Sequence, residues 1–332
     1  MNFSDIGRVK AIEMLFEGTP FKPFKAASAS MKKESVCVTR NKLLLEGTDF
    51  NLVYFPLKHL GYKAITIAAG QLYAAFAHPD AIDISIGVSA KLDFPQIKEL
   101  WEGMVSAAKE HGFANMNLDL VPSRNGLIIA LAASGHTEKI WQTRRPKPQS
   151  KDLICVSGSL GAAYLGMSLL EEETAKYEKD RTQPDLERYK MIVGSYLKPE
   201  LSPSVLAHLE ELEIVPSTSY LVDRGLADAL KQLCRDTGLG AKVYADKIPF
   251  EGNTFELGKK LDIDPVSAAF GGGEDYRLLF TIPILKMEAF RHNFQTFDII
   301  GHLAQSDVGA VLVMPEGAEL PVHSQGWKED EE

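Results

Sequence analysis

The sequence predicts a chain of mixed α/β and α+β structure that folds into two domains. Its 332 residues are long for a single domain and sufficient for two hydrophobic cores. Strand and helix patterns alternate over residues 39–133, whereas residues 141–151 hold two prolines, four cationic residues and no apolar period. We therefore expect an N-terminal α/β domain of residues 1–140 and a C-terminal α+β domain of residues 141–332.

The composition indicates an ordinary globular protein, with 45% hydrophobic and 24% charged residues. A net charge of −9 argues against a surface for nucleic acid or anionic membrane, because phosphate groups are bound by clustered Lys and Arg. There is no long apolar run and no signal-peptide pattern, so we expect a cytoplasmic protein. Cys37, Cys155 and Cys234 lie far apart among apolar neighbours, so we expect buried, reduced thiols.

Residues 39–79 carry the clearest pattern of the first domain. An apolar strand runs to a turn at Glu46 and Gly47, and a long helix begins after Pro56. Apolar residues recur along this helix every three to four positions, with many alanines that allow another element to approach closely. We therefore expect a buried helix, with these positions in its stripe: Leu57, Leu60, Ala64, Ile67, Ala68, Leu72 and Ala75.

The rest of the first domain alternates in the same way. A short helix is expected over residues 6–16, an alternating strand over 81–89, and a helix from Pro95 to the glycine after His111. Two further strands follow at 118–121 and 127–133. The turn residues between these strands predict a hairpin.

The second domain opens with a strand at residues 153–157, a glycine turn at 158–161 and a helix from Ala162. This arrangement presents backbone N–H groups that suit a phosphate. Its spacing, however, matches neither a Walker loop nor a dinucleotide fingerprint, and tight helix packing explains the glycines equally well. Further elements are expected as helices at 171–196, 204–212 and 226–237, and as strands at 241–245, 277–281, 298–303 and 309–313.

Several segments together resemble thiamine-monophosphate kinase, a family of the aminoimidazole ribonucleotide synthetase-like superfamily. The most specific is Gly-Gly-Glu-Asp-Tyr before an apolar strand, at residues 272–281. The others occur in the family's order within residues 38–327, at 45–50, 60–64, 152–161, 214–216 and 225–226.

The resemblance implies an N-terminal domain whose strands pair with those of a second copy into a barrel, and a C-terminal domain that covers a cleft. It also implies a homodimer that transfers the γ-phosphoryl group of ATP to thiamine monophosphate. Such a transfer depends on positioning and on Mg²⁺ ions held by carboxylates, which the family carries on its N-terminal domain.

In the first half of the chain, the family's acidic motifs fall on residues that are mostly not acidic. One motif falls near residues 24–29 and another on 68–71, and neither stretch contains an acid. The aspartate of a third motif falls on Lys42. In that motif Glu46, Gly47 and Phe50 are kept, and Asp49 replaces a histidine.

Two later motifs keep acids only in part. Asp119 is the one acid within the motif at residues 117–120, and it is the candidate metal ligand. Arg224 occupies a ligand position in the next motif, one residue after Asp223. A cation at a metal-ligand position costs several kcal/mol in a partly buried site, so Mg²⁺ is not expected at Lys42 or Arg224.

We therefore expect kinase activity to be lost or strongly reduced, with a cleft retained for a nucleotide or another anion. The candidate anion-binding residues are Lys42, Asp119, Asp223 and Arg224. The candidate substrate-pocket residues are Glu46, Gly47, Asp49, Phe50, Gly272, Gly273, Glu274, Asp275 and Trp327.

Two alternatives remain open at this stage. One is an active kinase with a rearranged site built from Glu46, Asp49, Asp119 and Asp223. The other is a dimeric interaction or regulatory module without catalysis. In purely structural terms, Glu274 and Asp275 would brace the loop before the strand and Trp327 would be a core residue.

Overall fold

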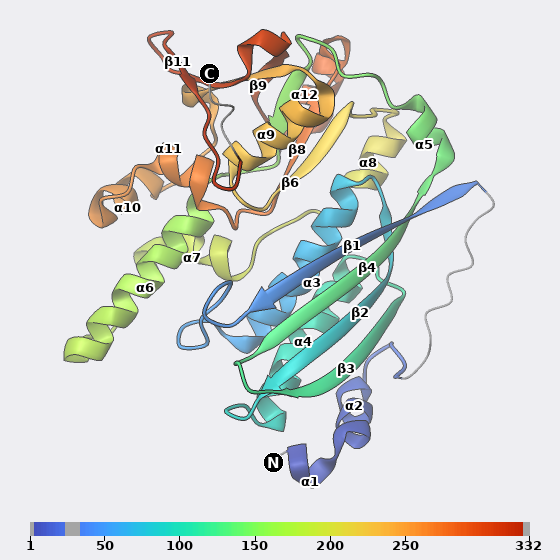
Figure 1. Cartoon of the computed structure of the whole chain (residues 1–332), viewed down its shortest axis with the longest axis vertical. Helices are drawn as coiled ribbons and strands as arrows, with labels where there is room; N and C mark the ends of the chain where they lie inside the picture. Colours follow the sequence, from blue (N-terminus) through green and yellow to red (C-terminus); the bar gives the residue numbers. More distant parts are fainter. Residues whose placement is uncertain (1–2, 24–33, 328–332) are drawn as a thin grey trace. The chain divides into compact units, whose positions relative to one another are not determined.

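The computed structural model describes residues 3–23 and 34–327, which fold into two compact units. The first unit comprises residues 1–143 with 200–206, and the second comprises residues 144–199 with 207–332. The chain thus passes from one unit to the other within the proline-containing, basic stretch, and a short later segment returns to the first unit. Figure 1 shows the elements of both units in chain order.

The first unit is built on a four-stranded sheet. Its strands are β1 (Ser35–Leu45), β2 (His78–Ser89), β3 (Asn115–Ser123) and β4 (Ile128–Glu138), in the order β1-β4-β2-β3. The predicted hairpin is wrong, because β4 pairs with β1 and β2 and not with β3. A crossover helix between β2 and β3 makes those two strands parallel neighbours, and β4 pairs with the other side of β2.

Two long helices, α3 (Leu57–Ala74) and α4 (Phe94–Glu110), cover one face of this sheet (Figure 1). They cross at Gly61 and Gly103, where an added Cβ would lie 1.9 Å from the Leu100 or the Lys58 carbonyl oxygen of the other helix. The prediction of a buried helix that another element approaches closely is confirmed. Asp93 begins α4 with a capping box, in which its side chain accepts from the Gln96 N–H.

Shorter helices complete the first unit. They are α1 (Phe3–Ile6), α2 (Arg8–Phe16) and α5 (Lys139–Arg144). In α2, Leu15 and Phe16 are buried, and the Phe16 ring lies 4.8 Å from the Trp101 ring of α4. This contact attaches α2 to α4.

The second unit is a seven-stranded mixed sheet with helices around it. Its order is β11-β10-β7-β9-β5-β8-β6, and only β7 and β10 are parallel. The strands are β5 (Leu153–Val156), β6 (Thr218–Val222), β7 (Gly240–Tyr244), β8 (Arg277–Ile282), β9 (Asp298–Ala304), β10 (Ala310–Val313) and β11 (Glu319–Pro321). The helices along this part of the chain are α6 (Ala162–Asp180), α7 (Lys190–Leu197), α8 (Val205–Glu211), α9 (Leu226–Thr237), α10 (Thr254–Leu261), α11 (Pro265–Ser267) and α12 (Met287–Asn293).

The cysteines are not all buried. Cys155 is buried in the second unit and Cys234 is half-buried, but Cys37 is exposed on β1. The prediction for Cys37 is wrong because β1 is an edge strand and Cys37 lies on the sheet face that the helices leave uncovered. None of the helices in the described part of the chain is long and apolar enough to cross a membrane.

Candidate functional site

Asp119 lies on the open face of the first unit's sheet. Its carboxylate accepts a hydrogen bond from Arg8 Nη1 at 2.8 Å, and both side chains are more than half exposed. The register places Asp119 in one cross-strand row with Ser85, Ala130 and Leu43. The one acid kept in its motif therefore carries an arginine as its partner.

A cavity of about 670 Å³ lies beside this ion pair. Arg8 and Arg124 supply its positive charge, Ser89 and Ser123 line it with them, and most of the remaining wall is apolar. Guanidinium groups bind carboxylates and phosphates through paired hydrogen bonds, so this cavity suits an organic anion. Sequence reasoning missed both arginines, because neither lies in a motif that the resemblance singles out.

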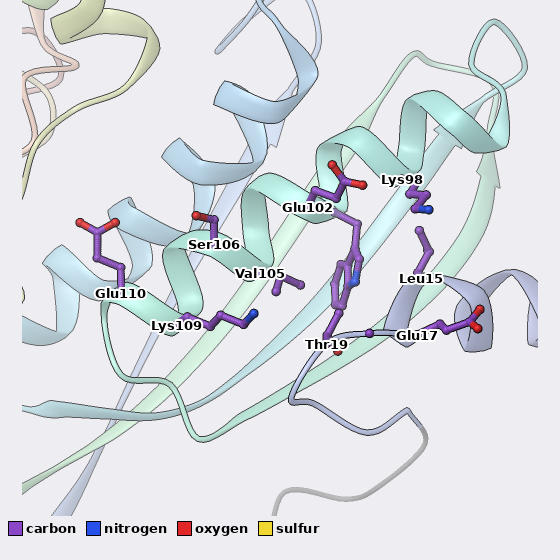
Figure 2. A pocket seen from close by; sticks show the side chains of 11 residues that line it. Leu15, Glu17, Thr19, Lys98, Glu102, Val105, Ser106, Lys109 and Glu110 are labelled. Carbon is purple, nitrogen blue, oxygen red and sulfur yellow. The ribbon is translucent and has the colours of Figure 1, made fainter.

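A second cavity, of about 580 Å³, lies between the end of α2 and the length of α4 (Figure 2). Lys98, Glu102 and Lys109 from α4 line it, with Glu17 from the chain after α2. Trp101 also lines this cavity, and its buried Nε1 has no hydrogen-bond partner among the residues that the structure describes. A buried donor without a partner is costly, but the Nε1 atom is buried from solvent and is not exposed to a ligand in this cavity.

Lys42 and Asp119 do not share a site within the first unit. They lie on β1 and β3, the two edge strands of the sheet. Lys42 pairs with Leu131 in the row of the helix-covered face, whereas Asp119 lies in the next row on the open face. Their predicted common role therefore has no geometric support within one copy of this unit.

Glu46 and Asp49, in the turn after β1, each accept a hydrogen bond from a backbone N–H. Asp49 Oδ2 accepts from the Leu45 N–H at 2.8 Å, and Glu46 Oε2 accepts from the Leu127 N–H at 2.6 Å. The Gly47 N–H donates to the Phe50 carbonyl at 2.8 Å, and the Phe50 side chain is buried. The structure thus gives Glu46 and Asp49 a structural role in joining β1 to the β3–β4 connection.

The second unit brings four of the candidate residues together. The Glu274 N–H donates to the Asp223 carbonyl at 2.8 Å, and a Cβ on Gly273 would lie 2.9 Å from that oxygen. Arg224 follows Asp223 and is exposed. The glycine loop before β8 and the turn between β6 and α9 are therefore in direct backbone contact.

Asp275, in the loop before β8, is almost fully buried, and its carboxylate lies against the start of α6. Its carboxylate accepts from the Gly161 N–H at 2.8 Å and from the Ala163 N–H at 3.2 Å. Burial raises the pKa of Asp275 to about 7, and the two backbone hydrogen bonds oppose that rise. From the sequence, the N–H groups of this segment are expected to suit a phosphate. In the structure the Gly161 and Ala163 N–H groups donate to Asp275 instead.

Trp327 lies against α9. Its Nε1 donates to Asp228 Oδ1 at 2.8 Å, and the Arg235 guanidinium lies 5.1 Å from the centre of the ring. Its polar edge is therefore already engaged within the second unit. The same contact fixes the last described residue of the chain.

The described acids do not form a Mg²⁺ ligand set. Across residues 3–23 and 34–327, no group of three His, Cys, Asp or Glu residues is placed to hold a metal ion. Asp119 is paired with an arginine, and Glu46, Asp49 and Asp275 bind backbone N–H groups. The motif expected near residues 24–29 lies outside the described residues.

Sequence similarity extends over most of the chain, although no protein-family model matches it. The thiamine-monophosphate kinase of Bacillus subtilis (strain 168) is 23% identical over 300 residues, which cover 89% of this chain and 87% of that protein. The thiamine-monophosphate kinase of Aquifex aeolicus (strain VF5) is 24% identical over 290 residues, with coverage of 86% and 85%.

Solved structures share the fold. Thiamine-monophosphate kinase from Stenotrophomonas maltophilia K279a has a TM-score of 0.73 and 22% identity, covering 85% of this chain and 86% of that one. AaThiL complexed with AMPPCP and TMP has a TM-score of 0.71 and 21% identity, covering 96% of each chain. E. coli HypE, a hydrogenase maturation protein, has a TM-score of 0.72 and 14% identity, covering 96% and 97%. The predicted resemblance and the aminoimidazole ribonucleotide synthetase-like fold are confirmed.

Proposed function

We propose, from the premise that this chain is related to the thiamine-monophosphate kinases, that it binds a nucleotide or another phosphate ester with lost or strongly reduced phosphoryl transfer. The observation that carries the proposal is the cavity with Arg8 and Arg124 beside Asp119. The structure of a related protein in complex with AMPPCP and TMP supports phosphorylated ligands as the class.

The cavity at Arg8 suits the phosphate groups of such a ligand. Helix α2 borders both cavities, with Arg8 in its first turn and Leu15 in its last. These residues are about 10 Å apart along the helix axis, a separation within the length of an elongated nucleotide.

Reduced phosphoryl transfer follows from the charges at the motif positions. Lys42 and Arg224 replace acids, and the remaining Asp119 is neutralised by Arg8. A transferring phosphoryl group needs divalent cations that neutralise its developing charge, and these residues do not supply their ligands. Binding by arginine and lysine instead requires no Mg²⁺.

The test is isothermal titration with ATP and with thiamine monophosphate, each with Mg²⁺ and with EDTA. We expect ATP to bind equally in both media, and Arg124→Ala to weaken it by about tenfold or more through loss of a charge-assisted hydrogen bond. Arg40→Ala is the matched control, because Arg40 is an exposed arginine of β1 outside the cavity.

Other outcomes decide between the alternatives. Binding that requires Mg²⁺, together with formation of thiamine diphosphate, would favour an active kinase with a rearranged site. No binding would leave a non-catalytic dimeric module. Lys42→Asp and Arg224→Asp test the predicted anion-binding residues, and unchanged ATP affinity in both would contradict their role.

The resemblance also supports a cytoplasmic homodimer. The open face of the first unit's sheet carries Leu43 and Val121, which are 51% and 45% exposed, next to the small residue Ala130. Such a face suits a second sheet better than water. Light scattering coupled to size exclusion measures the mass, and a monomer at micromolar concentration would contradict the pairing.

A further inference from the structure

Two non-glycine residues of the loop before β8 have a left-handed backbone conformation, which such residues rarely adopt. Gly273, Glu274 and Tyr276 have φ angles of 73°, 66° and 49°. The left-handed region costs a non-glycine residue about 1–2 kcal/mol, so Glu274 and Tyr276 need other contacts to stay there. The Tyr276 hydroxyl donates to Glu274 Oε1 at 2.7 Å, which links the two side chains within the loop.

Asp275 lies between these residues and reaches a different element. Its two carboxylate oxygens are engaged by the backbone of Gly161 and Ala163, at the start of the 19-residue helix α6. Gly161 is itself held closely, since an added Cβ would lie 2.9 Å from Ala269 N. Asp275 therefore connects the loop before β8 to the start of α6 through two hydrogen bonds.

The same loop also determines the position of the turn that carries Arg224. The Glu274 N–H donates to the Asp223 carbonyl at 2.8 Å, and the Tyr276 N–H donates to the Val222 carbonyl at 2.9 Å. These two bonds flank Asp275 in sequence. We expect displacement of Asp275 from α6 to move both of these donors to the turn at residues 222–225.

We infer that Asp275 is the positioning residue that fixes the Arg224 turn relative to the start of α6. The inference builds on the proposed function, in which Arg224 is one of the predicted anion-binding residues to be tested. It gives the Gly-Gly-Glu-Asp-Tyr segment at residues 272–276 a positioning role, which involves neither metal binding nor contact with a substrate. Glu274 and Arg277 are the charged groups that act on this carboxyl, and burial raises its pKa to about 7.

The first experiment needs no ligand. In a deuterated ¹⁵N-labelled wild-type protein, we expect the Gly161 and Ala163 amide resonances to titrate with a midpoint near the pKa of Asp275, about 7. Asp275→Asn should abolish that titration, whereas Asp264→Asn should preserve it. Asp264 is a matched control because its exposed side chain caps α11 at the Ser267 N–H. Amides of Gly161 and Ala163 that share no titration at any pH in the wild type would contradict their hydrogen bonds to Asp275 and overturn the inference, even if the variant failed to fold.

The second experiment measures the coupling itself by hydrogen exchange. Asp275→Asn should accelerate exchange by about tenfold in residues 158–165 and also in residues 222–226. Faster exchange confined to residues 158–165 or 271–277 would show that the acid caps α6 without positioning the Arg224 turn, and would overturn the inference.

ATP titration of Asp275→Asn, Arg224→Ala and the double variant separates this inference from the proposed function. We expect each single variant to weaken ATP binding and the double variant to weaken it no further than Arg224→Ala alone. If wild type does not bind ATP, the proposed function fails while the exchange result still decides the role of Asp275. Additive losses in the double variant would contradict the coupling.

Discussion

His111 of the first unit and Asp275 of the second are both buried titratable groups, yet they give their units opposite responses to pH. His111 follows α4 and is 3% exposed, with its Nδ1 3.1 Å from the Tyr73 hydroxyl. Burial lowers the pKa of His111 to about 4, whereas burial raises the pKa of Asp275 to about 7.

The physical cause is the same in both cases, because burial disfavours whichever form is charged. For the histidine the charged form carries the proton, and for the aspartate it does not. The comparison shows that the direction of pH sensitivity depends on the chemical type of the buried group and not on its depth. The opposite pH responses also allow the stability of each unit to be followed separately.

The largest effect is expected at the crossing of α3 and α4. Gly103→Ala places a methyl group about 1.9 Å from the Lys58 carbonyl oxygen, so the helices must separate. We expect a loss of more than about 4 kcal/mol of unfolding free energy in the first unit. Hydrogen exchange resolved by peptide measures this, and it should leave the second unit protected.

Gly194→Ala in α7 is the matched control for that substitution. Nothing lies within 4 Å of an added Cβ there, and the residue is inside a helix. We expect it to stabilise the second unit by about 0.5–1 kcal/mol. If both alanine variants destabilise their units equally, close approach is not the cause.

Asp275 should make the second unit less stable as pH rises. The folded-state pKa is near 7 and the unfolded value is 3.8, so the folded state holds the proton over that interval. Stability attributable to this group is complete below the unfolded value and decreases up to pH 7, by at most about 4 kcal/mol. Denaturant unfolding of wild type and Asp275→Asn from pH 4 to 8 checks it. Parallel pH profiles would contradict the assignment.

His111 should act in the opposite direction on the first unit. The unfolded chain takes up a proton below its ordinary value of 6.5, but the folded state does so only near 4. Stability is therefore lost as pH falls through this window, by about 3 kcal/mol. His111→Leu should flatten the profile, while His292→Ala, at an exposed position of α12, should not. The measurement is the same pH series, read on first-unit peptides.

A smaller effect is expected at Trp327. Trp327→Phe keeps the ring beside Arg235 but removes the Nε1 donor to Asp228, so a buried aspartate loses a hydrogen bond. We expect a loss of about 1–2 kcal/mol in the second unit, since hydrogen bonds to charged groups contribute that much. Chemical denaturation measures it. No change would show that Gln232, which also binds Asp228, suffices.

The smallest stability effect is expected for Arg8→Ala. The Arg8–Asp119 pair is 60% and 52% exposed, and exposed pairs contribute less than about 1 kcal/mol. Its consequence should appear in ligand binding instead, because the variant removes one of two arginines from the cavity. A large loss of stability would mean that Arg8 has a structural role in holding α2 on β3.

Much of the local structure could be predicted from the sequence, because periodicity and turn residues act over short distances. The stripe of α3 and the alternation in β2 are such signals. The helix expected from Pro95 is α4, which begins at Phe94 after the capping box at Asp93.

Pairing between distant segments could not be predicted in this way. The prediction of a β3–β4 hairpin was wrong because it rested only on the turn between these two strands. In the structure β4 pairs with β1, and the crossover through α4 makes β3 a parallel neighbour of β2. Arg8 and Asp119 are 111 positions apart, and Asp275 and Gly161 are 114 apart. No local pattern in the sequence marks either contact. The cavity with Arg8 and Arg124 and the contact of Asp275 with the start of α6 therefore required the three-dimensional structure.

The central position of β5 has a consequence for synthesis on the ribosome. Leu153 and its neighbours enter the second unit's sheet between β8 and β9, which are formed by residues much later in the chain. The first unit's sheet, by contrast, has all four strands once β4 is made. A nascent chain therefore carries an apolar strand without partners for most of the translation of its second half, while the first sheet can already close. Translation pauses after residue 153 should raise aggregation and chaperone dependence, whereas pauses just before it should not.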